Sequence, residues 1–482
     1  MYDYVIIGGG PSGIYCADKL SLVGKKVCLI ESLETIGGCH RVRYVTDEEG
    51  NRIHTEHGPR VYLGSYLDFW KWIQTIHVER ETHFLKYKFD MFSKDFVSFI
   101  TMFKLHELLS ILLLYIINCI LHISISENYT LEEFSNDFKF STNGKQRLNR
   151  LARLIDGGNV DKSLVKAFIE GIDTGFAYNI YQPNESMDTL LWNKFHRKLV
   201  NQNVDILLNT EVTRITKNKV DIGDRTIHTD SIILTIPPYA LNKIKNAPRL
   251  VGYDPIQFNK LSNYQQYEPY VCCSIKFNSY GESKWGISDS HPWGIIAIDM
   301  GKYFKHVEGS LFIVSVTHPE KIDPKTNLSA NSMNKGEFLD RIVDLVKLRF
   351  KLNEEPIYKT FSPNVQKIKG KWIETDRAFL FSPPGWLKPD LTISKQNKVY
   401  TTGHHIGNSY HDYNSMESAI QNASELLSTI EENYTYEISK PWTLSTMIKI
   451  VLCVVLVVLL MYTYRKYVIK KITMIIKTLD LS

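Results

Sequence analysis

The sequence predicts an α/β fold in which a parallel sheet flanked by helices is interrupted by an inserted α+β domain and followed by a C-terminal transmembrane helix. Three observations support this prediction. A strand-like segment at 4–7 runs directly into a glycine-rich turn, strand-like segments return near 205–235 and 399–403, and an apolar run at 447–464 precedes a cluster of basic residues. The first two observations indicate one sheet assembled from distant parts of the chain.

The composition is that of a globular protein and excludes several classes. The 482 residues are 44% hydrophobic and 23% charged, which is inconsistent with a disordered or collagen-like chain. The length suggests two or three domains. The net charge of +5 is too small to indicate a nucleic-acid partner, and much of it comes from 465–477. Seven scattered cysteines, without the two-residue spacing of zinc or redox motifs, predict reduced thiols and no metal site.

The N-terminal segment carries the most informative motif. Residues 4–7 read as a buried strand, the pattern Gly8-x-Gly10-x-x-Gly13 opens a helix over 14–20, and a second strand over 26–30 ends at Glu31. Strand, glycine pattern, helix, strand and acid in this order form the complete fingerprint of a Rossmann-like dinucleotide site.

Each residue of this fingerprint has a physical role. Gly8 permits the tight turn, Gly10 lets a pyrophosphate approach the backbone, and Gly13 lets the helix pack on the strand. The phosphates would meet the helix N-terminus, where free N–H groups and the helix dipole favour negative charge. Glu31 is placed to accept both hydroxyls of an adenosine ribose, which argues against NADP at this site.

Further motifs follow in a characteristic order. A second glycine pair, Gly37 and Gly38, comes shortly after Glu31, and 57–61 reads His-Gly-Pro-Arg-Val. Four more segments lie at 203–215, 230–241 with a Pro-Pro pair, 399–403 and 415–420. Together these blocks resemble the superfamily of FAD-dependent amine oxidases and protoporphyrinogen oxidases.

The resemblance implies a GR2-type FAD-binding domain that holds FAD without a covalent link. The residues it implies for FAD binding are Gly8, Gly10, Gly13, Glu31, Gly37, Gly38, Arg41, Gly58, Val212, Gly403, Ser415 and Met416. Two features depart from the pattern. His404 stands where the family often has an acid, and the strand position of the family's flavin-facing lysine falls on Val271 or Cys272 rather than Lys276. No catalytic residue is assigned.

The resemblance implies hydride transfer from a small organic substrate, with amines as one class, to the flavin and then to oxygen or another acceptor. One alternative is an enzyme similar to UDP-galactopyranose mutase, which 50–61, 69–72 and, faintly, 410–414 resemble. Another is a catalytically idle FAD-binding membrane scaffold. The motifs do not define the substrate or the oligomeric state.

The motif positions also define the expected domains. The FAD-binding domain is expected to combine 1–90, 200–245 and 395–432, and the substrate domain 91–199 and 246–394. A transmembrane anchor is expected at 445–465, followed by a basic tail at 466–482.

Two apolar runs are candidates for membrane contact. The run at 108–126 has no Asp, Glu, Lys or Arg, but a single crossing there would separate parts of one FAD domain, so a buried or monotopic helix is expected. The run at 447–464 follows the last FAD motif, is flanked by Trp442 and Tyr464, and predicts a single-pass C-terminal anchor. The alternative is an amphipathic helix docked on the body. Since no leader is apparent before the first strand, the catalytic domain is expected in the cytosol, with the orientation of the tail left open.

Overall fold

The structure is a computed structural model. It describes residues 1–46, 49–50, 52–87, 103–126, 128–155, 159–175, 178–262, 271–282, 286–288, 291–375, 389–406 and 415–479.

A seven-stranded sheet forms the centre of the nucleotide-binding part. Its strands are β1 (Tyr2–Ile7), β2 (Val27–Ile30), β8 (Asp205–Leu207), β9 (Val212–Ile215), β10 (Lys219–Ile222), β11 (Arg225–Leu234) and β19 (Val399–Thr401). The order is β8-β2-β1-β11-β10-β9, and β19 also pairs with β11. Strands β8, β2, β1, β11 and β19 are parallel, whereas β9 and β10 form an antiparallel extension. The Rossmann-like α/β fold predicted from the sequence is therefore confirmed.

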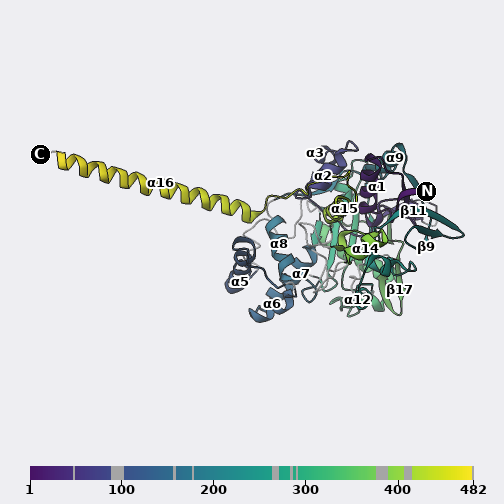
Figure 1. Cartoon of the computed structure of the whole chain (residues 1–482). Helices are drawn as coiled ribbons and strands as arrows, with labels where there is room; N and C mark the ends of the chain where they lie inside the picture. Colours follow the sequence, from purple (N-terminus) through teal and green to yellow (C-terminus); the bar gives the residue numbers. More distant parts are fainter. Residues whose placement is uncertain are drawn as a thin grey trace.

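Two helical layers cover this sheet, because alternate residues of each strand point to opposite faces. Tyr4 and Ile6 pack with α1 (Pro11–Leu22), α2 (Leu67–Gln74), α9 (Asn193–Asn201) and α15 (Met416–Ile430). Val5 and Ile7 pack with α10 (Pro238–Leu241), α11 (Ala247–Val251) and α12 (Pro255–Leu261). Helix α14 (Leu391–Asn397) lies beside α11 and β19. Segments far apart in the sequence thus enclose both faces of one sheet (Figure 1).

A second sheet of five antiparallel strands builds the inserted α+β part. In the order β13-β14-β15-β12-β16 it contains β12 (Val271–Lys276), β13 (Gly286–Ser288), β14 (Ile295–Asp299), β15 (Leu311–Val316) and β16 (Tyr358–Phe361). Helix α13 (Lys335–Phe350) packs Phe338, Ile342 and Val346 into its core, and Asn334 with Glu337 forms a capping box at its start.

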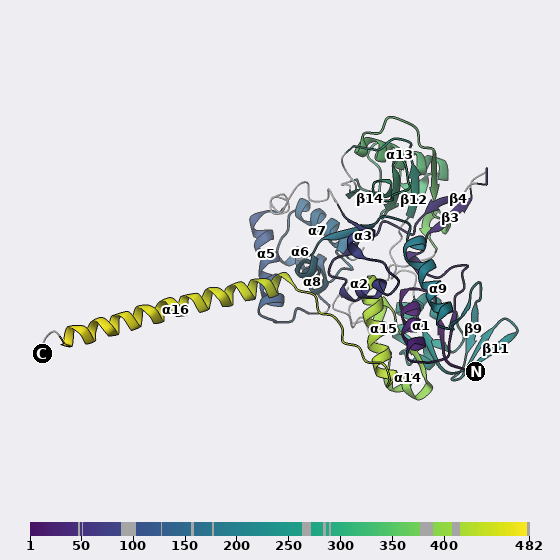
Figure 2. The same cartoon turned by 90° about the horizontal axis from the view of Figure 1, so that it is seen from above.

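Smaller elements connect the two parts. They are β3 (Arg43–Thr46) paired with β4 (Arg52–Thr55), β17 (Val365–Ile368) paired with β18 (Lys371–Glu374), and a sheet of β5 (Tyr62–Leu63), β7 (Ile180–Pro183) and β6 (Phe84–Lys86), which follows α3 (Arg80–His83). Figure 2 shows the second sheet above the nucleotide-binding part, with β3 and β4 at their junction.

A helical unit occupies the remaining side of the body. It consists of α5 (Leu105–Tyr115), the π-helical turn η2 (Ile116–Ile120), α6 (Leu131–Asp137), α7 (Thr142–Ile155) and α8 (Val165–Gly175). These elements share a core that includes Ile111, Leu114, Phe134 and Phe168. The uncharged run at 108–126 begins in α5 and packs only one of its sides into this core.

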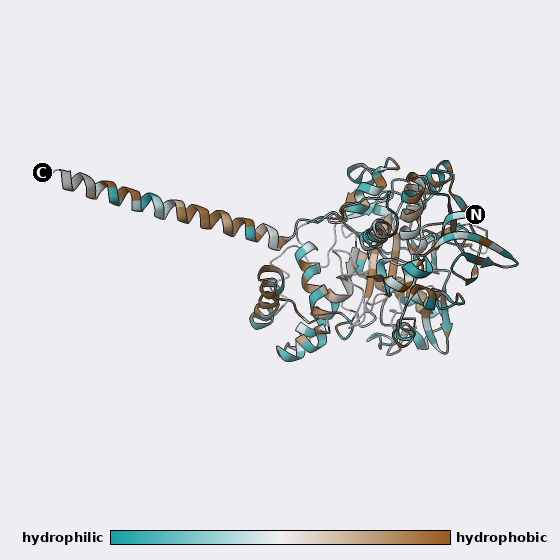
Figure 3. Ribbon diagram, in the orientation of Figure 1, coloured by the Kyte–Doolittle hydropathy of each residue, from teal (hydrophilic) through white to brown (hydrophobic). Residues whose placement is uncertain are grey.

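The last helix, α16 (Leu444–Leu479), projects away from the body (Figure 1). Its segment Leu444–Met474 is long and apolar enough to cross a membrane, and almost all of it is exposed in the isolated chain. Figure 3 shows its hydrophobic first half. The helix continues without a break past residue 465, so the basic residues expected in a separate tail extend the same helix.

Candidate functional site

The candidate site lies where the parallel strands end. The glycine turn follows β1, Glu31 follows β2, Thr235 follows β11 and Gly403 follows β19. Because all these strands are parallel, their carboxyl ends meet at one edge, which is where open α/β sheets bind ligands.

The first glycine turn is held by close backbone contacts. Gly8 has φ +112°, a conformation that side chains rarely adopt, and a Cβ there would lie 2.7 Å from Ile236. A Cβ on Gly13 would lie 1.9 Å from the carbonyl oxygen of Gly8, so α1 can pack on β1 only with glycine at this position. The hydroxyl of Thr235 donates to the same oxygen at 2.7 Å. Thr235 lies in the 230–241 block, but only the structure shows that its side chain contacts the glycine turn.

Gly10 is the residue that leaves space in front of the turn. It precedes α1 as its N-cap, and a Cβ there would find Gly38 Cα as its nearest neighbour, 3.9 Å away. Among the described residues, no side chain caps this helix, and Pro11 has no N–H to offer. The first turn of α1 therefore presents free backbone donors and the positive end of the helix dipole to this edge.

The carboxylate of Glu31 is buried at the end of β2. One oxygen accepts from the backbone N–H of Gly9 at 2.7 Å, and the other from Leu33 N–H at 3.0 Å and from the Ser32 hydroxyl at 3.1 Å. The backbone N–H of Thr210 donates to the Glu31 carbonyl at 3.0 Å. This contact brings the start of β9, and with it Val212, to the same end of the sheet.

The second glycine pair, Gly37 and Gly38, lies against the first glycine turn. Gly37 (φ +117°) donates its N–H to the Gly9 carbonyl at 2.7 Å. A Cβ on Gly38 would lie 2.9 Å from Gly10 Cα, and the buried Arg41 side chain donates to the Gly38 carbonyl at 2.5 Å. The indole of Trp192 covers Gly37, where a Cβ would be 2.6 Å from the ring, and donates to the His40 carbonyl at 2.9 Å. Sequence reasoning missed Trp192, which directly precedes α9 and packs in the same core as Tyr4 and Ile6.

The segment around Gly58 joins this edge to the second sheet. A Cβ on Gly58 would lie 3.2 Å from the Ser315 hydroxyl and 3.3 Å from the Cys272 sulfur. The Cys272 thiol also donates to the His57 carbonyl. Cys272 therefore faces this segment, whereas the Lys276 ammonium, four residues along β12, donates to the carbonyl of Glu308. The register expected from the sequence, with Lys276 away from the site, agrees with this arrangement.

Two histidines follow Gly403 in the turn η7 (His404–Ile406), His405 buried and His404 partly buried. Burial lowers the pKa of His404 to about 4, and burial together with His404 lowers the pKa of His405 to about 3. Both rings are therefore neutral near pH 7. Within the described ranges, the buried Nε2 atom of each ring has no hydrogen-bond partner. The expected acid is thus replaced by neutral imidazoles with unused hydrogen-bonding capacity.

A third histidine shows that the distant motifs converge. The pKa of the partly buried His40 is lowered well below its usual value, first by the loss of hydration and then by electrostatic interaction with Arg60, His57 and His404. His57 and Arg60 belong to one motif block, His404 follows a second, and His40 itself follows the second glycine pair, so three parts of the chain meet here. On the far side of the β19 turn, the Ser415 hydroxyl caps α15 by accepting from Ser418 N–H at 3.0 Å, and Met416 is buried behind it. The segment 410–414 lies outside the described residues.

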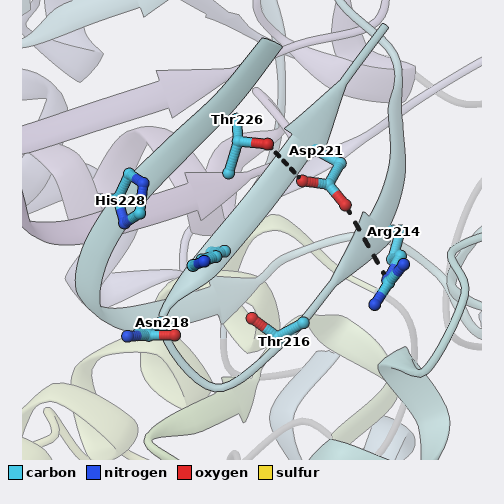
Figure 4. A pocket seen from close by; sticks show the side chains of 7 residues that line it. Arg214, Thr216, Asn218, Asp221, Thr226 and His228 are labelled. Carbon is cyan, nitrogen blue, oxygen red and sulfur yellow. Dashed lines mark hydrogen bonds and ion pairs between the residues drawn. The ribbon is translucent and has the colours of Figure 1, made fainter. Parts of the chain in front are cut away.

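A separate surface hollow does not belong to this site. It lies on the antiparallel extension β9–β10–β11 and is lined by Arg214, Thr216, Asn218, Lys219, Asp221, Thr226 and His228 (Figure 4). The residues it uses from β11 are at the amino end of that strand, whereas the glycine turn lies beyond its carboxyl end. The hollow therefore carries none of the predicted site residues.

Comparisons with known proteins agree with this geometry. Residues 6–76 match the family described as NAD(P)-binding Rossmann-like domain. A 75-residue segment is 39% identical to (S)-6-hydroxynicotine oxidase of Paenarthrobacter nicotinovorans and covers 14% of this chain but only 17% of that relative.

Solved structures extend the similarity to most of the chain. Cyclohexylamine oxidase from Brevibacterium oxydans IH-35A aligns with 89% of this chain and 99% of its own, with a TM-score of 0.59 and 15% identity. Reduced UDP-galactopyranose mutase aligns with 90% of this chain and 97% of its own, with a TM-score of 0.60 and 15% identity. This chain therefore contains an FAD/NAD(P)-type Rossmann domain and has the fold of the flavin amine oxidases, a fold that it also shares with the mutase.

Proposed function

We propose that this protein is a membrane-anchored, FAD-dependent oxidoreductase of the amine oxidase type. It takes a hydride from a small organic substrate, amines foremost, and passes the electrons to oxygen or another acceptor. This proposal rests on one observation: the first glycine turn, the glycine pair Gly37 and Gly38, and the buried Glu31 lie together at the carboxyl edge of the parallel sheet.

The residues at this edge fit the ADP half of FAD. The space in front of Gly10 and the uncapped start of α1 suit a pyrophosphate, and the Glu31 carboxylate suits the two ribose hydroxyls. Gly8, Gly13, Gly37, Gly38, Arg41 and Val212 would complete this half of the site, with Gly58, Gly403, Ser415 and Met416 beside the flavin half. No cysteine is assigned a covalent link, so binding is proposed to be non-covalent.

The chain's own groups would orient the substrate and exclude water from it. Bound flavin would supply the acceptor for two electrons. His404 and His405 are neutral over the physiological range, and their Nε2 atoms are available to hydrogen-bond a ligand at this edge. Neutral imidazoles add no positive charge that would repel a cationic amine. We assign no catalytic base, since a neutral amine does not require one for hydride transfer.

The mutase remains a second candidate because its structure aligns as well as that of the oxidase. A mutase must bind a sugar diphosphate, for which arginines are the usual ligands. The two arginines described at this edge are already engaged: Arg41 is assigned to the FAD site, and Arg60 donates to Glu56 at 3.4 Å and to the Cys39 carbonyl. This pairing favours the oxidase. An idle FAD-binding scaffold is the third candidate.

Membrane attachment is proposed to occur through α16. Within Leu444–Met474 lies an apolar stretch with the length and composition of a membrane span, and almost none of that stretch is buried against the body. The basic residues between 465 and 477 would remain on the far side, and the catalytic part would face the cytosol.

One experiment separates the three candidates. The full chain is purified in detergent, its visible spectrum is recorded, and candidate amines are added without oxygen. Loss of the flavin absorbance on adding an amine supports the oxidase, whereas turnover of a UDP-sugar only after reduction with dithionite supports the mutase. Bound flavin that responds to neither supports the scaffold. A preparation that cannot retain or take up flavin would contradict all three.

A further inference from the structure

Helix α5 carries an apolar stripe on the side that faces away from its own core. Ile111, Leu114 and Tyr115 are buried in the helical unit. The opposite side is formed by large apolar residues that are 38–74% exposed, namely Leu105, Leu109, Leu112, Leu113 and Ile116. Their spacing of three or four residues places them on one face of the helix.

The stripe continues beyond α5 and is not interrupted by charge. Leu121 and Ile123 are 58% and 56% exposed, and 108–126 contains no Asp, Glu, Lys or Arg. Soluble proteins seldom expose a contiguous apolar surface of this kind without a partner that covers it. We call the seven residues Leu105, Leu109, Leu112, Leu113, Ile116, Leu121 and Ile123 the outer stripe.

The start of α16 is fixed beside this stripe. Asp173 of α8 accepts from the N–H of Ser445 at 2.6 Å, from its hydroxyl at 2.7 Å, and from the Tyr115 hydroxyl at 2.7 Å. Lys449 donates to the Cys119 carbonyl at 2.8 Å, and its Nζ lies 2.8 Å from His122 Nε2. One carboxylate thus joins α8, the end of α5 and the first turn of α16.

Helix α5 therefore lies on the side of the body from which α16 projects. Leu444 and Ile448 of α16 pack against the same core as the buried side of α5. In both views α5 forms the edge of the body next to the base of α16 (Figures 1 and 2). A bilayer crossed by α16 would thus begin at the level of the outer stripe.

We propose that the outer stripe lies in the surface of the same bilayer that α16 crosses, as a second, monotopic membrane contact. This inference rests on the proposed anchoring by α16. A helix that is apolar on its exposed face binds at the boundary of headgroups and acyl chains, where its buried apolar area is removed from water. Lys104 precedes the stripe and Lys449 lies beside it, at the level of the headgroups, where long cationic side chains are favoured.

Two membrane contacts would determine the orientation of the body, which a single contact does not. A single helix leaves the body free to tilt, whereas α16 and the outer stripe together hold the catalytic part in one orientation to the membrane. We assign the outer stripe to lipid rather than to a second copy of the chain because it lies beside the base of α16, whose own apolar surface is also exposed.

The test places a reporter on the stripe of the full chain. Leu112→Trp is reconstituted into phosphatidylcholine vesicles with brominated or plain acyl chains, since bromine quenches tryptophan only on contact. Leu348→Trp, on an exposed leucine of α13, is the matched control. After subtraction of the wild-type signal, Leu112→Trp is expected to lose most of its added emission in brominated vesicles, and Leu348→Trp none. Leu113→Trp replaces the first variant if that one does not fold.

Protection of the C-terminal basic residues from external trypsin is measured in the same vesicles. If they are protected and Leu112→Trp keeps its emission, the monotopic contact is overturned while the anchor stands. If they are digested and the protein is released, the anchor fails and this inference fails with it, whereas the flavin assay is unaffected. Unquenched but blue-shifted emission together with a dimer in detergent would assign the stripe to a second copy, which also overturns the proposal.

Discussion

The carboxyl group of Glu417, in the first turn of α15, accepts a hydrogen bond of 2.9 Å from the backbone N–H of Asp68 at the start of α2. The other Glu417 oxygen accepts from Phe69 N–H at 2.8 Å. Asp68 itself accepts from the Ser439 N–H at 3.1 Å and from the Tyr436 hydroxyl, both in the segment that leads to α16. A buried pair of carboxyl groups thus connects α2, α15 and the segment that leads to α16.

The Glu417 carboxyl predicts that stability falls as the pH rises. Burial, followed by the negative charge of Asp68, raises its pKa from 4.5 to about 8. Between these values the folded state keeps a proton that the unfolded state has lost, so the free energy of unfolding decreases by up to about 1.4 kcal/mol per pH unit. Glu417→Gln removes this titration, and its Tm should change less than that of the wild type between about pH 5 and pH 8.

The control for this measurement is Glu432→Gln, because Glu432 is exposed. It should retain the wild-type slope. Parallel slopes for the wild type and Glu417→Gln would contradict the assignment.

Asp68→Ala should release the segment that precedes α16. The substitution leaves the donors of Ser439, Gln421 and Tyr436 without their charged acceptor, at a cost of about 3 kcal/mol. Faster proteolysis within 431–443 and a lower Tm are expected. Glu437→Ala, at an exposed position in the same segment, should alter neither. Unchanged proteolysis of the Asp68 variant would show that Asp68 does not hold this segment.

Substitutions at two glycines of the first turn should separate cofactor binding from folding. A methyl group on Gly10 meets no atom closer than 3.9 Å, so Gly10→Ala should fold but bind less flavin per chain, measured from the visible absorbance. A methyl group on Gly13 would lie 1.9 Å from the Gly8 carbonyl oxygen, so Gly13→Ala should lower the Tm itself.

Gly336→Ala serves as the control for both variants, because its nearest neighbour would be 3.4 Å away and alanine favours the helix there. Full flavin occupancy in Gly10→Ala would argue against a pyrophosphate at this position.

The buried His405 predicts the opposite pH dependence to Glu417. Its pKa is lowered from 6.5 to about 3, so below about pH 6.5 the unfolded state binds a proton that the folded state does not. Stability is therefore lost as the pH falls. Between about pH 7 and pH 5, the Tm of His405→Gln should decrease less than the Tm of the wild type. His306→Gln, at an exposed position, should behave as the wild type. An unchanged acid slope in the His405 variant would show that this ring is not neutral in the folded protein.

The local parts of the fold could be predicted because their determinants are close together in the chain. Strand β1, the glycine turn, α1, β2 and Glu31 fall within 31 residues, and their hydrophobic pattern and glycine spacing are sufficient to define them. The same holds for α13, with its capping box and apolar periodicity. The distant strands β11 and β19 could be assigned to the same sheet only through the order of the motifs.

What the sequence determined by itself was therefore a Rossmann-like fold with a glycine-rich edge, a terminal apolar helix and the position of the site. Only the tertiary structure placed Trp192 over Gly37, paired Glu417 with Asp68, and divided α5 into a buried and an exposed face. The physical reason is that these contacts join residues up to 349 positions apart, and periodicity reports on a face of one element but not on what covers that face. For the outer stripe, the apolar residues were visible in the sequence, and their direction relative to α16 was not.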